Sequence, residues 1–162
     1  MTVQDAGVAL DVVALEGFVV RAKSVTYVGG GEPVPASRTG SHDLAFAEGP
    51  WGYLDSYVGA SDFLGQELVT FEGEPVWAMN YYGYLLRPDL IDAARTGFVI
   101  RAALSAMYAE GRFLGGFAHE IQGYAYTDTS EGDVTHFSGT EWISEGGERL
   151  YELRYHGGLV RD

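Results

Sequence analysis

Apolar residues recur at helical spacing in the first part of the chain. In the segment VALDVVALEGFVVRAKS, residues 8–24, the apolar positions are Leu10, Val13, Ala14, Phe18, Val19 and Ala22. This spacing gathers them on one helical face, so we predict a helix over residues 9–23. Three consecutive glycines and two prolines then break the pattern, which indicates a loop to about residue 41.

After Asp43 the pattern changes to short segments rich in aromatic and β-branched residues, which are typical of strands. Four such segments extend to Leu85: LAFAE, WGYLDSYV, FLGQELVTF and PVWAMNYYGYL. A second helix is predicted over residues 88–109, because Pro88 and Asp89 are favourable in a first turn. Four further strands are predicted at residues 117–126, 133–138, 139–145 and 148–156.

The two halves of the chain resemble each other. Residues 63–85 and 137–159 align without a gap at an offset of 74, and 8 of the 23 positions are identical. The helical segments repeat at an offset of 80, as GFVVRA and GFVIRA. Four glycine pairs recur in register, as expected for turns or close packing: Gly17 and Gly97, Gly65 and Gly139, Gly73 and Gly147, Gly83 and Gly157.

These patterns together predict an α+β fold with an antiparallel sheet. We expect two pseudo-symmetric repeats, about 9–86 and 87–160, each a helix followed by about four antiparallel strands. One unit of this size buries little apolar surface, so the two would share one core within a single domain, 1–162.

Composition supports a packed interior and excludes several classes. The 162 residues are 46% apolar and 14% aromatic, which suits a globular core. The chain contains no cysteine, which excludes a disulfide scaffold and a thiolate nucleophile and fits a cytoplasmic location. A formal charge of −13 argues against binding to nucleic acid. No apolar run approaches the roughly 18 residues of a membrane span, so we expect no membrane contact.

Strand alternation places a glutamate on the more apolar face of the same strand in both halves. These residues are Glu67 and Glu141. Two carboxyl groups near a shared axis resist simultaneous ionisation, so one of them could serve as a general acid or base near neutral pH. The alternative is that each glutamate pairs with an arginine of the repeated helix, Arg21 or Arg101.

Further polar residues are candidates for a ligand cleft. Tyr53, Asp55 and Tyr57 alternate along one strand and share a face that suits an organic ligand. The alternative is an amphipathic strand whose tyrosine hydroxyls reach water. Arg38 lies in a loop with several hydrogen-bond donors and could bind a carboxylate or phosphate group of a ligand. The alternative is a loop arginine that is solvated.

The last strands of the two halves differ in chemistry on one face. Their apolar residues are predicted to face the core, and the opposite face carries different polar side chains in the two copies. These four positions are also candidates for ligand binding: Asn80, Tyr82, Arg154 and His156.

The chain lacks the spacing of common metal and nucleotide sites. His119 and Glu120 are not followed by the second histidine of HExxH, and the remaining histidines show no ligand spacing. The glycine clusters are not followed by GK[ST] and do not lie within a βαβ unit, and GxSxG is absent. We therefore expect no metal and no cofactor.

Several segments resemble a bacterial domain family of unknown function. These are SRTGSHDLAF, YLDSYVGASDFLGQELVTFEGEPVWAMNYYGYL, FSGTE and YELRYHGGLV, and the likeness covers about residues 17–160. In that family the domain occurs alone or behind a helix-turn-helix of the Cro/C1 type, so the resemblance implies a link to regulators but no reaction. Only about eight residues precede the first predicted helix, so we expect the DNA-binding part to be missing here.

Two functions from different classes fit these observations. The first is a small-molecule-binding domain, related to sensor modules of bacterial regulators, with a small organic ligand in a cleft between the two halves. The second is a cofactor-independent acid–base enzyme, such as an isomerase, cyclase or hydrolase, that uses Glu67 or Glu141. A structural module that binds a protein partner ranks third, and a homodimer stays open.

Overall fold

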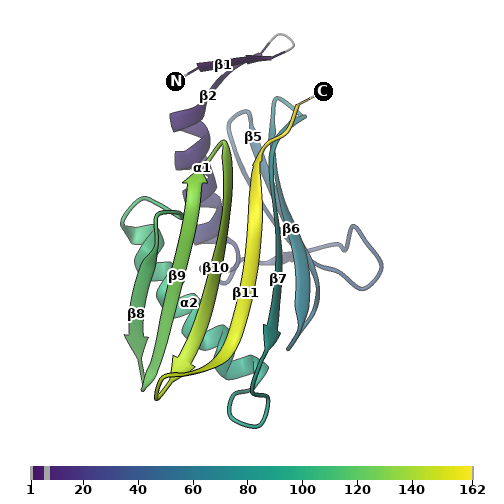
Figure 1. The fold of residues 1–162 in the computed structure, drawn as a ribbon. Helices are drawn as coiled ribbons and strands as arrows, with labels where there is room; N and C mark the ends of the chain where they lie inside the picture. The colour runs from purple at the N-terminus through teal and green to yellow at the C-terminus, as the bar shows by residue number, and fades with distance from the viewer. Residues whose placement is uncertain (1, 6–7, 162) are drawn as a thin grey trace.

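The main element of the computed structural model is a nine-stranded antiparallel sheet, and the model describes residues 2–5 and 8–161 (Figure 1). A two-stranded hairpin, β1 (Thr2–Asp5) and β2 (Val8–Asp11), precedes helix α1 (Val12–Val25). Helix α2 (Ala93–Ala109) connects the two halves of the sheet. The strands of the sheet are β3 (Pro33–Val34), β4 (His42–Glu48), β5 (Trp51–Gly59), β6 (Phe63–Phe71), β7 (Glu74–Leu85), β8 (Phe117–Ile121), β9 (Tyr124–Asp133), β10 (His136–Glu145) and β11 (Glu148–Leu159).

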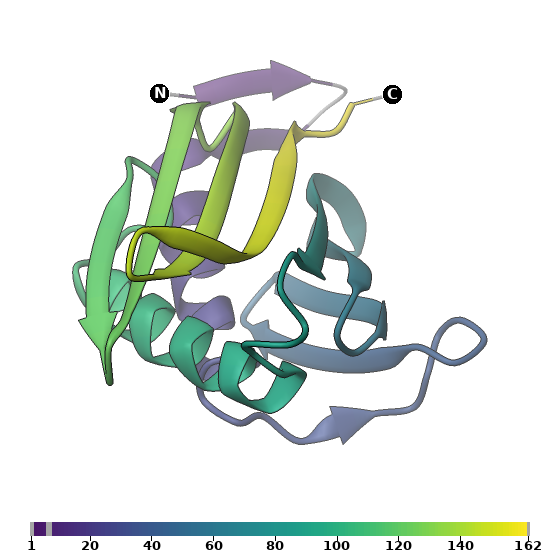
Figure 2. The same ribbon diagram turned by 60° about the horizontal axis from the view of Figure 1, so that its bottom comes forward.

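The sheet consists of two meanders that meet in its middle. Its strand order is β3-β4-β5-β6-β7-β11-β10-β9-β8, and the halves join where β7 pairs with β11, with Tyr81 opposite Tyr155. The sheet curves around the helices, which lie on one of its faces (Figure 2). Helix α1 packs on β4 and β5, α2 packs on β8 and β9, and the helices contact each other.

The predicted α+β class, with an antiparallel sheet and two helices, is confirmed. The short strand β3 adds a ninth member in the segment predicted as a loop, and it pairs with β4 at the sheet edge. The predicted single domain includes residues 1, 6, 7 and 162, which lie outside the described residues. No helix in the described ranges is long and apolar enough to cross a membrane.

Both helices begin later than predicted because an aspartate caps each one. The side chain of Asp11 accepts hydrogen bonds from Val13 N (2.9 Å) and Ala14 N (3.2 Å), so α1 begins at Val12 rather than at residue 9. Asp92 accepts from Arg95 N at 2.7 Å, so α2 begins at Ala93 rather than at residue 88.

Two strand boundaries of the second half also differ from the prediction. The expected strand 117–126 is split into β8 and β9 by a turn at Gln122 and Gly123, both with positive φ. Such turns favour Asn-Gly or Asp-Gly, so Gln-Gly was a weak signal. The expected break after residue 138 does not exist, because β10 pairs continuously with β9 from His136 to Ser144.

Two glycines let tyrosine rings cross a neighbouring strand. Gly65 on β6 lies opposite Tyr81 on β7, and a Cβ at Gly65 would lie 2.3 Å from the Tyr81 hydroxyl oxygen. Gly139 and Tyr155 have the same relation, since a Cβ there would also lie 2.3 Å from the hydroxyl oxygen. Each ring therefore passes over its glycine to an aspartate two strands away.

We expect Gly65→Ala to destabilise the protein by about 1–3 kcal/mol, because its methyl group would displace the Tyr81 ring. Urea denaturation measures this change. Gly17→Ala is the matched control: its Cβ would meet only the exposed Arg21 side chain, at 3.2 Å, and Ala is better than Gly inside a helix by about 0.5–1 kcal/mol. Equal stability of Gly65→Ala and the wild type would contradict the packing role.

Candidate functional site

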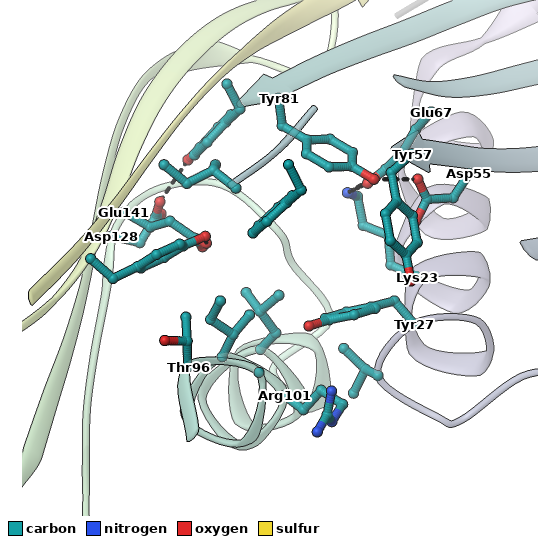
Figure 3. A pocket seen from close by; sticks show the side chains of 18 of the residues that line it. Lys23, Tyr27, Asp55, Tyr57, Glu67, Tyr81, Thr96, Arg101, Asp128 and Glu141 are labelled. Atoms are coloured by element: carbon teal, nitrogen blue, oxygen red, sulfur yellow. Dashed lines mark hydrogen bonds and ion pairs between the residues drawn. The ribbon is translucent and has the colours of Figure 1, made fainter. Parts of the chain in front are cut away.

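A cavity of about 430 Å³ lies between the curved sheet and the two helices (Figure 3). Its walls come from α1, α2 and strands of both halves, and eight of the chain's eleven tyrosines line it. The lining residues Ala60, Ala94 and Arg101 are exposed, so the cavity opens to solvent between the β5–β6 turn and α2. Its lining is otherwise largely aromatic and aliphatic, as in ligand pockets.

Four carboxyl groups enter this cavity as two pairs. Asp55 on β5 lies opposite Glu67 on β6, and Asp128 on β9 lies opposite Glu141 on β10. All four side chains are buried, with residue exposures of 4–6%. Figure 3 shows the two pairs on different sides of the cavity.

The first pair is held by a lysine and a tyrosine. Lys23, the only lysine of the chain, extends from α1 and places Nζ 2.8 and 2.7 Å from the two carboxylate oxygens of Glu67. The Lys23 ammonium also lies 5.3 Å from the centre of the Phe113 ring. Tyr81 donates its hydroxyl proton to Asp55 Oδ1 at 2.6 Å.

The second pair is held by tyrosines alone. Tyr126 and Tyr151 donate to Glu141, the latter at 3.2 Å, and Tyr155 donates to Asp128 Oδ1 at 2.8 Å. The other oxygen of Asp128, Oδ2, is buried and accepts no hydrogen bond. Glu67 Oε2 also accepts none by strict geometry, but its ion pair with Lys23 compensates it.

Burial shifts the ionisation of these groups. Loss of solvation raises the pKa of Glu141 to about 7, and the charge of Asp128 adds to this rise, against the hydrogen bond from Tyr126. Burial likewise raises the pKa of Asp128 to about 6, against the hydrogen bond from Tyr155 and the charges of Arg112 and Lys23. The pKa of Asp55 is also raised, first by burial and then by the charge of Glu67.

Five of the residues proposed from the sequence line this cavity, from strands of both halves. They are Tyr53, Asp55, Tyr57, Glu67 and Glu141. The carboxylates that face each other closely are an aspartate and a glutamate of adjacent strands, rather than Glu67 and Glu141 as the sequence suggested. The alternative of glutamate–arginine pairs does not hold either, because Arg21 pairs with Glu48 and Glu67 with Lys23.

Four other proposed residues lie on the opposite face of the sheet, away from the helices. Asn80 accepts from Gln66 at 2.9 Å, and Arg154 donates to Glu152 at 3.2 Å. Tyr82 stacks on Tyr84, with ring centres 5.4 Å apart. His156 is exposed beside Asn80, and none of these side chains lines the cavity. Strand alternation had placed all four on one face, and that face is the outer one.

Arg38 also lies outside the cavity lining. Its guanidinium donates to the backbone oxygen of Ser56 at 2.6 Å and to the Ser56 hydroxyl at 3.0 Å. That hydroxyl in turn donates to Asp43 at 2.7 Å. Arg38 therefore fastens its loop to β5, which is a structural use of its donors.

Lys23 and Asp128 are the main residues that the sequence reasoning missed. Lys23 follows Val19 by four residues, so a lysine on the buried helical face was the available signal. Asp128 follows Tyr126 as Asp55 follows Tyr53, at an offset of 73 instead of 74. The β5–β6 connection has three residues and the β9–β10 connection has two. This difference of one residue explains why the offset is 73 before the turn and 74 after it.

The arrangement is chemically suited to proton transfer. Partly protonated carboxyl groups beside tyrosine hydroxyls can exchange protons with a ligand near neutral pH. Among the described residues, no group of three or more histidine or carboxylate side chains is placed to hold a metal ion.

Fold and site together define an α+β domain with an acidic, tyrosine-lined cavity that opens to solvent at one side. The model of a family described as a domain of unknown function, DUF5680, matches residues 55–160, which include all four cavity carboxylates. The match covers more than half of the chain, so the chain belongs to this family. No curated protein and no solved structure is significantly similar to it.

Removing the ammonium of Lys23 is expected to be costly at pH 7. Lys23→Met leaves Glu67 buried without its counter-charge, which costs about 3–5 kcal/mol. The double variant Lys23→Met, Glu67→Gln removes both charges and is expected to recover most of this loss in urea denaturation. If the single and double variants were equally unstable, lost packing rather than the ion pair would be the cause.

The raised pKa values predict that stability falls as the pH increases. Unfolded carboxyl groups have pKa values near 4, so the folded state holds these protons more tightly. This contribution is complete below pH 4 and is lost as the pH rises to about 7. Asp43 and Glu152, whose pKa values are lowered, contribute the opposite change below about pH 5. We therefore expect the Tm to fall between about pH 5 and 7, less steeply in Glu141→Gln, whereas the exposed control Glu131→Gln keeps the wild-type slope. An unchanged slope in Glu141→Gln would contradict the assignment.

Proposed function

We propose that this domain binds a small organic molecule in the cavity between the sheet and the two helices. The observation that carries this proposal is the cavity itself, about 430 Å³ in volume and lined by buried carboxylates and tyrosines. Buried polar groups lower the free energy of unfolding unless they are paired, so folding alone does not explain why this interior contains them. Recognition of a ligand does explain them.

We also propose that the two halves, about 9–86 and 87–160, are copies of one αβ unit. A helix and a four-stranded meander occur in the same order in each half. The set of Tyr53, Asp55, Glu67 and Tyr81 corresponds to that of Tyr126, Asp128, Glu141 and Tyr155. In this interpretation the ligand lies at the junction of the two copies.

A sensor role in bacterial regulation is the biological setting we propose. It rests on the resemblance to a family whose members occur alone or behind a helix-turn-helix. Bound ligand would contact α1, α2 and both meanders, so it would bias how these elements pack. A protein partner or a second copy would then respond to the ligand-bound form.

A cofactor-independent acid–base enzyme is the second candidate. It is favoured by Asp128 and Glu141, two adjacent carboxyl groups whose pKa values of about 6 and 7 suit proton transfer near neutral pH. Such a pair could protonate one atom of a substrate and deprotonate another, as isomerisation or cyclisation requires.

Closing the cavity mouth tests the binding function. A screen of small organic molecules should find ligands that raise the Tm and shift the backbone amide signals of cavity residues. We expect Ala94→Trp, at the mouth, to weaken such ligands at least tenfold, because the indole blocks entry. Ala109→Trp, on the exposed end of the same helix, is the control and should bind normally. Ligands that bind both variants equally would contradict the cavity as the site.

Glu141→Gln separates binding from catalysis. If the domain is an enzyme, this variant should bind its substrate normally and lose at least a hundredfold in kcat. If it is a sensor, no ligand found in the screen should be chemically changed by the wild type, as followed by mass spectrometry over hours.

A further inference from the structure

The charges of the cavity are unbalanced. Four carboxylates are buried there, and the cations among its described lining residues are Lys23 and Arg101, with His42 as the one imidazole. Lys23 is committed to Glu67. Arg101 is exposed at the mouth and lies 5.7 Å from the centre of the Tyr27 ring. Neither cation is bonded to the second carboxylate pair.

The chain itself shows how an ammonium group is held in this environment. Lys23 Nζ contacts both oxygens of Glu67, lies 3.9 Å from the Met79 sulfur and faces the Phe113 ring. A carboxylate with an aromatic surface is a recognised setting for an organic cation. The first half of the cavity therefore already contains a filled ammonium site, made by the protein.

The second half of the cavity has the carboxylate acceptors of such a site, but no lysine or arginine among the described residues is bonded to them. At the helix offset of 80, the residue that corresponds to Lys23 is Ala103. Asp128 is 4% exposed and its Oδ2 accepts no hydrogen bond. Arg112, whose charge influences Asp128, instead donates to Glu110 and to the backbone oxygens of Leu114 and Gly116.

We propose that the ligand of this domain is a small organic amine, whose ammonium group binds between Asp128 and Glu141. This inference rests on the proposed binding function and specifies its chemistry. The rings of Tyr126, Tyr151 and Tyr155 provide aromatic surface around the charge. Their hydroxyls donate to the carboxylates, and their oxygens keep lone pairs that can accept from the ammonium.

Other ligand classes fit this half of the cavity less well. An anion would be repelled by the two carboxylates, and a neutral molecule without a donor would leave Asp128 Oδ2 unpaired. For a metal ion, the described residues provide no group of three or more histidine or carboxylate ligands here. The cavity volume suits an aromatic or alicyclic amine rather than a bare ammonium ion.

Charge complementarity also predicts how binding depends on pH. A bound cation favours the ionised forms of its carboxylates and lowers their pKa values. Since Asp128 and Glu141 have pKa values of about 6 and 7 without ligand, binding near pH 6.5 should release protons. Affinity should therefore rise between about pH 5.5 and 8, as long as the amine stays protonated.

The test uses three probes of similar shape and different charge, titrated calorimetrically into the full chain at pH 7.5. They are 2-phenylethylamine, 2-phenylethanol and 3-phenylpropanoate. Two further amines, benzylamine and cyclohexylmethylamine, are tested in the same way with their corresponding alcohols and acids. We expect the amines to bind at least tenfold more tightly than the alcohols, and the carboxylates not to bind. Asp128→Asn should weaken the amines at least tenfold and leave the alcohols unchanged. Glu131→Gln, on the outer face of the same strand, should behave as the wild type.

A second measurement does not depend on the folding of any variant. Titration of the wild type at pH 6.5 in two buffers of different ionisation enthalpy gives the number of protons released on amine binding. We expect a clear release, and none would overturn the amine site. Alcohols that bind as tightly as amines would overturn the amine inference and leave the binding cavity standing. If no probe of any charge binds at millimolar concentration, both proposals fail.

Discussion

The burial of four carboxyl groups under two helices is the constraint on which this structure depends. Each would strongly destabilise a dry interior if it were charged and unpaired. Two kinds of contact compensate these groups. Lys23 neutralises Glu67, and tyrosines donate hydrogen bonds to Asp55, Asp128 and Glu141. Burial itself holds the latter three partly protonated near neutral pH, by raising their pKa values. The cavity therefore carries four buried carboxyl groups within a lining that is otherwise largely aromatic and aliphatic.

Backbone geometry makes this arrangement possible. Tyr81 and Tyr155 reach their aspartates only because Gly65 and Gly139 leave room for a ring above the strand between. The curvature of the sheet then brings both carboxylate pairs to one concave surface, which the helices cover (Figure 2). A flat sheet packed tightly on helices would leave no comparable space. Sheet shape, glycine positions and tyrosine contacts thus depend on one another.

Both halves place an aspartate beside a glutamate, with a tyrosine that donates to the aspartate, but they differ in how the charges are compensated. The first half supplies its own ammonium from α1, whereas the second half leaves an oxygen of Asp128 without a hydrogen bond. A symmetric pair of ion pairs would be a purely structural device. For the binding function that we propose, this difference favours a ligand that carries a positive charge of its own.

The sequence by itself predicted the two helices, most of the strands and the α+β class, because alternation and periodicity are local properties of the chain. It also proposed the five cavity residues Tyr53, Asp55, Tyr57, Glu67 and Glu141. It could not say which face of the sheet the helices cover, so Asn80, Tyr82, Arg154 and His156 were equally good candidates until the structure placed them outside. The first residues of the helices follow from the caps at Asp11 and Asp92, and the break between β8 and β9 follows from the positive φ of Gln122 and Gly123. The pairing of Lys23 with Glu67, across 44 positions, and the meeting of both carboxylate pairs in one cavity came from long-range packing alone. No local pattern encodes such distances, since they depend on how a curved sheet closes around its helices.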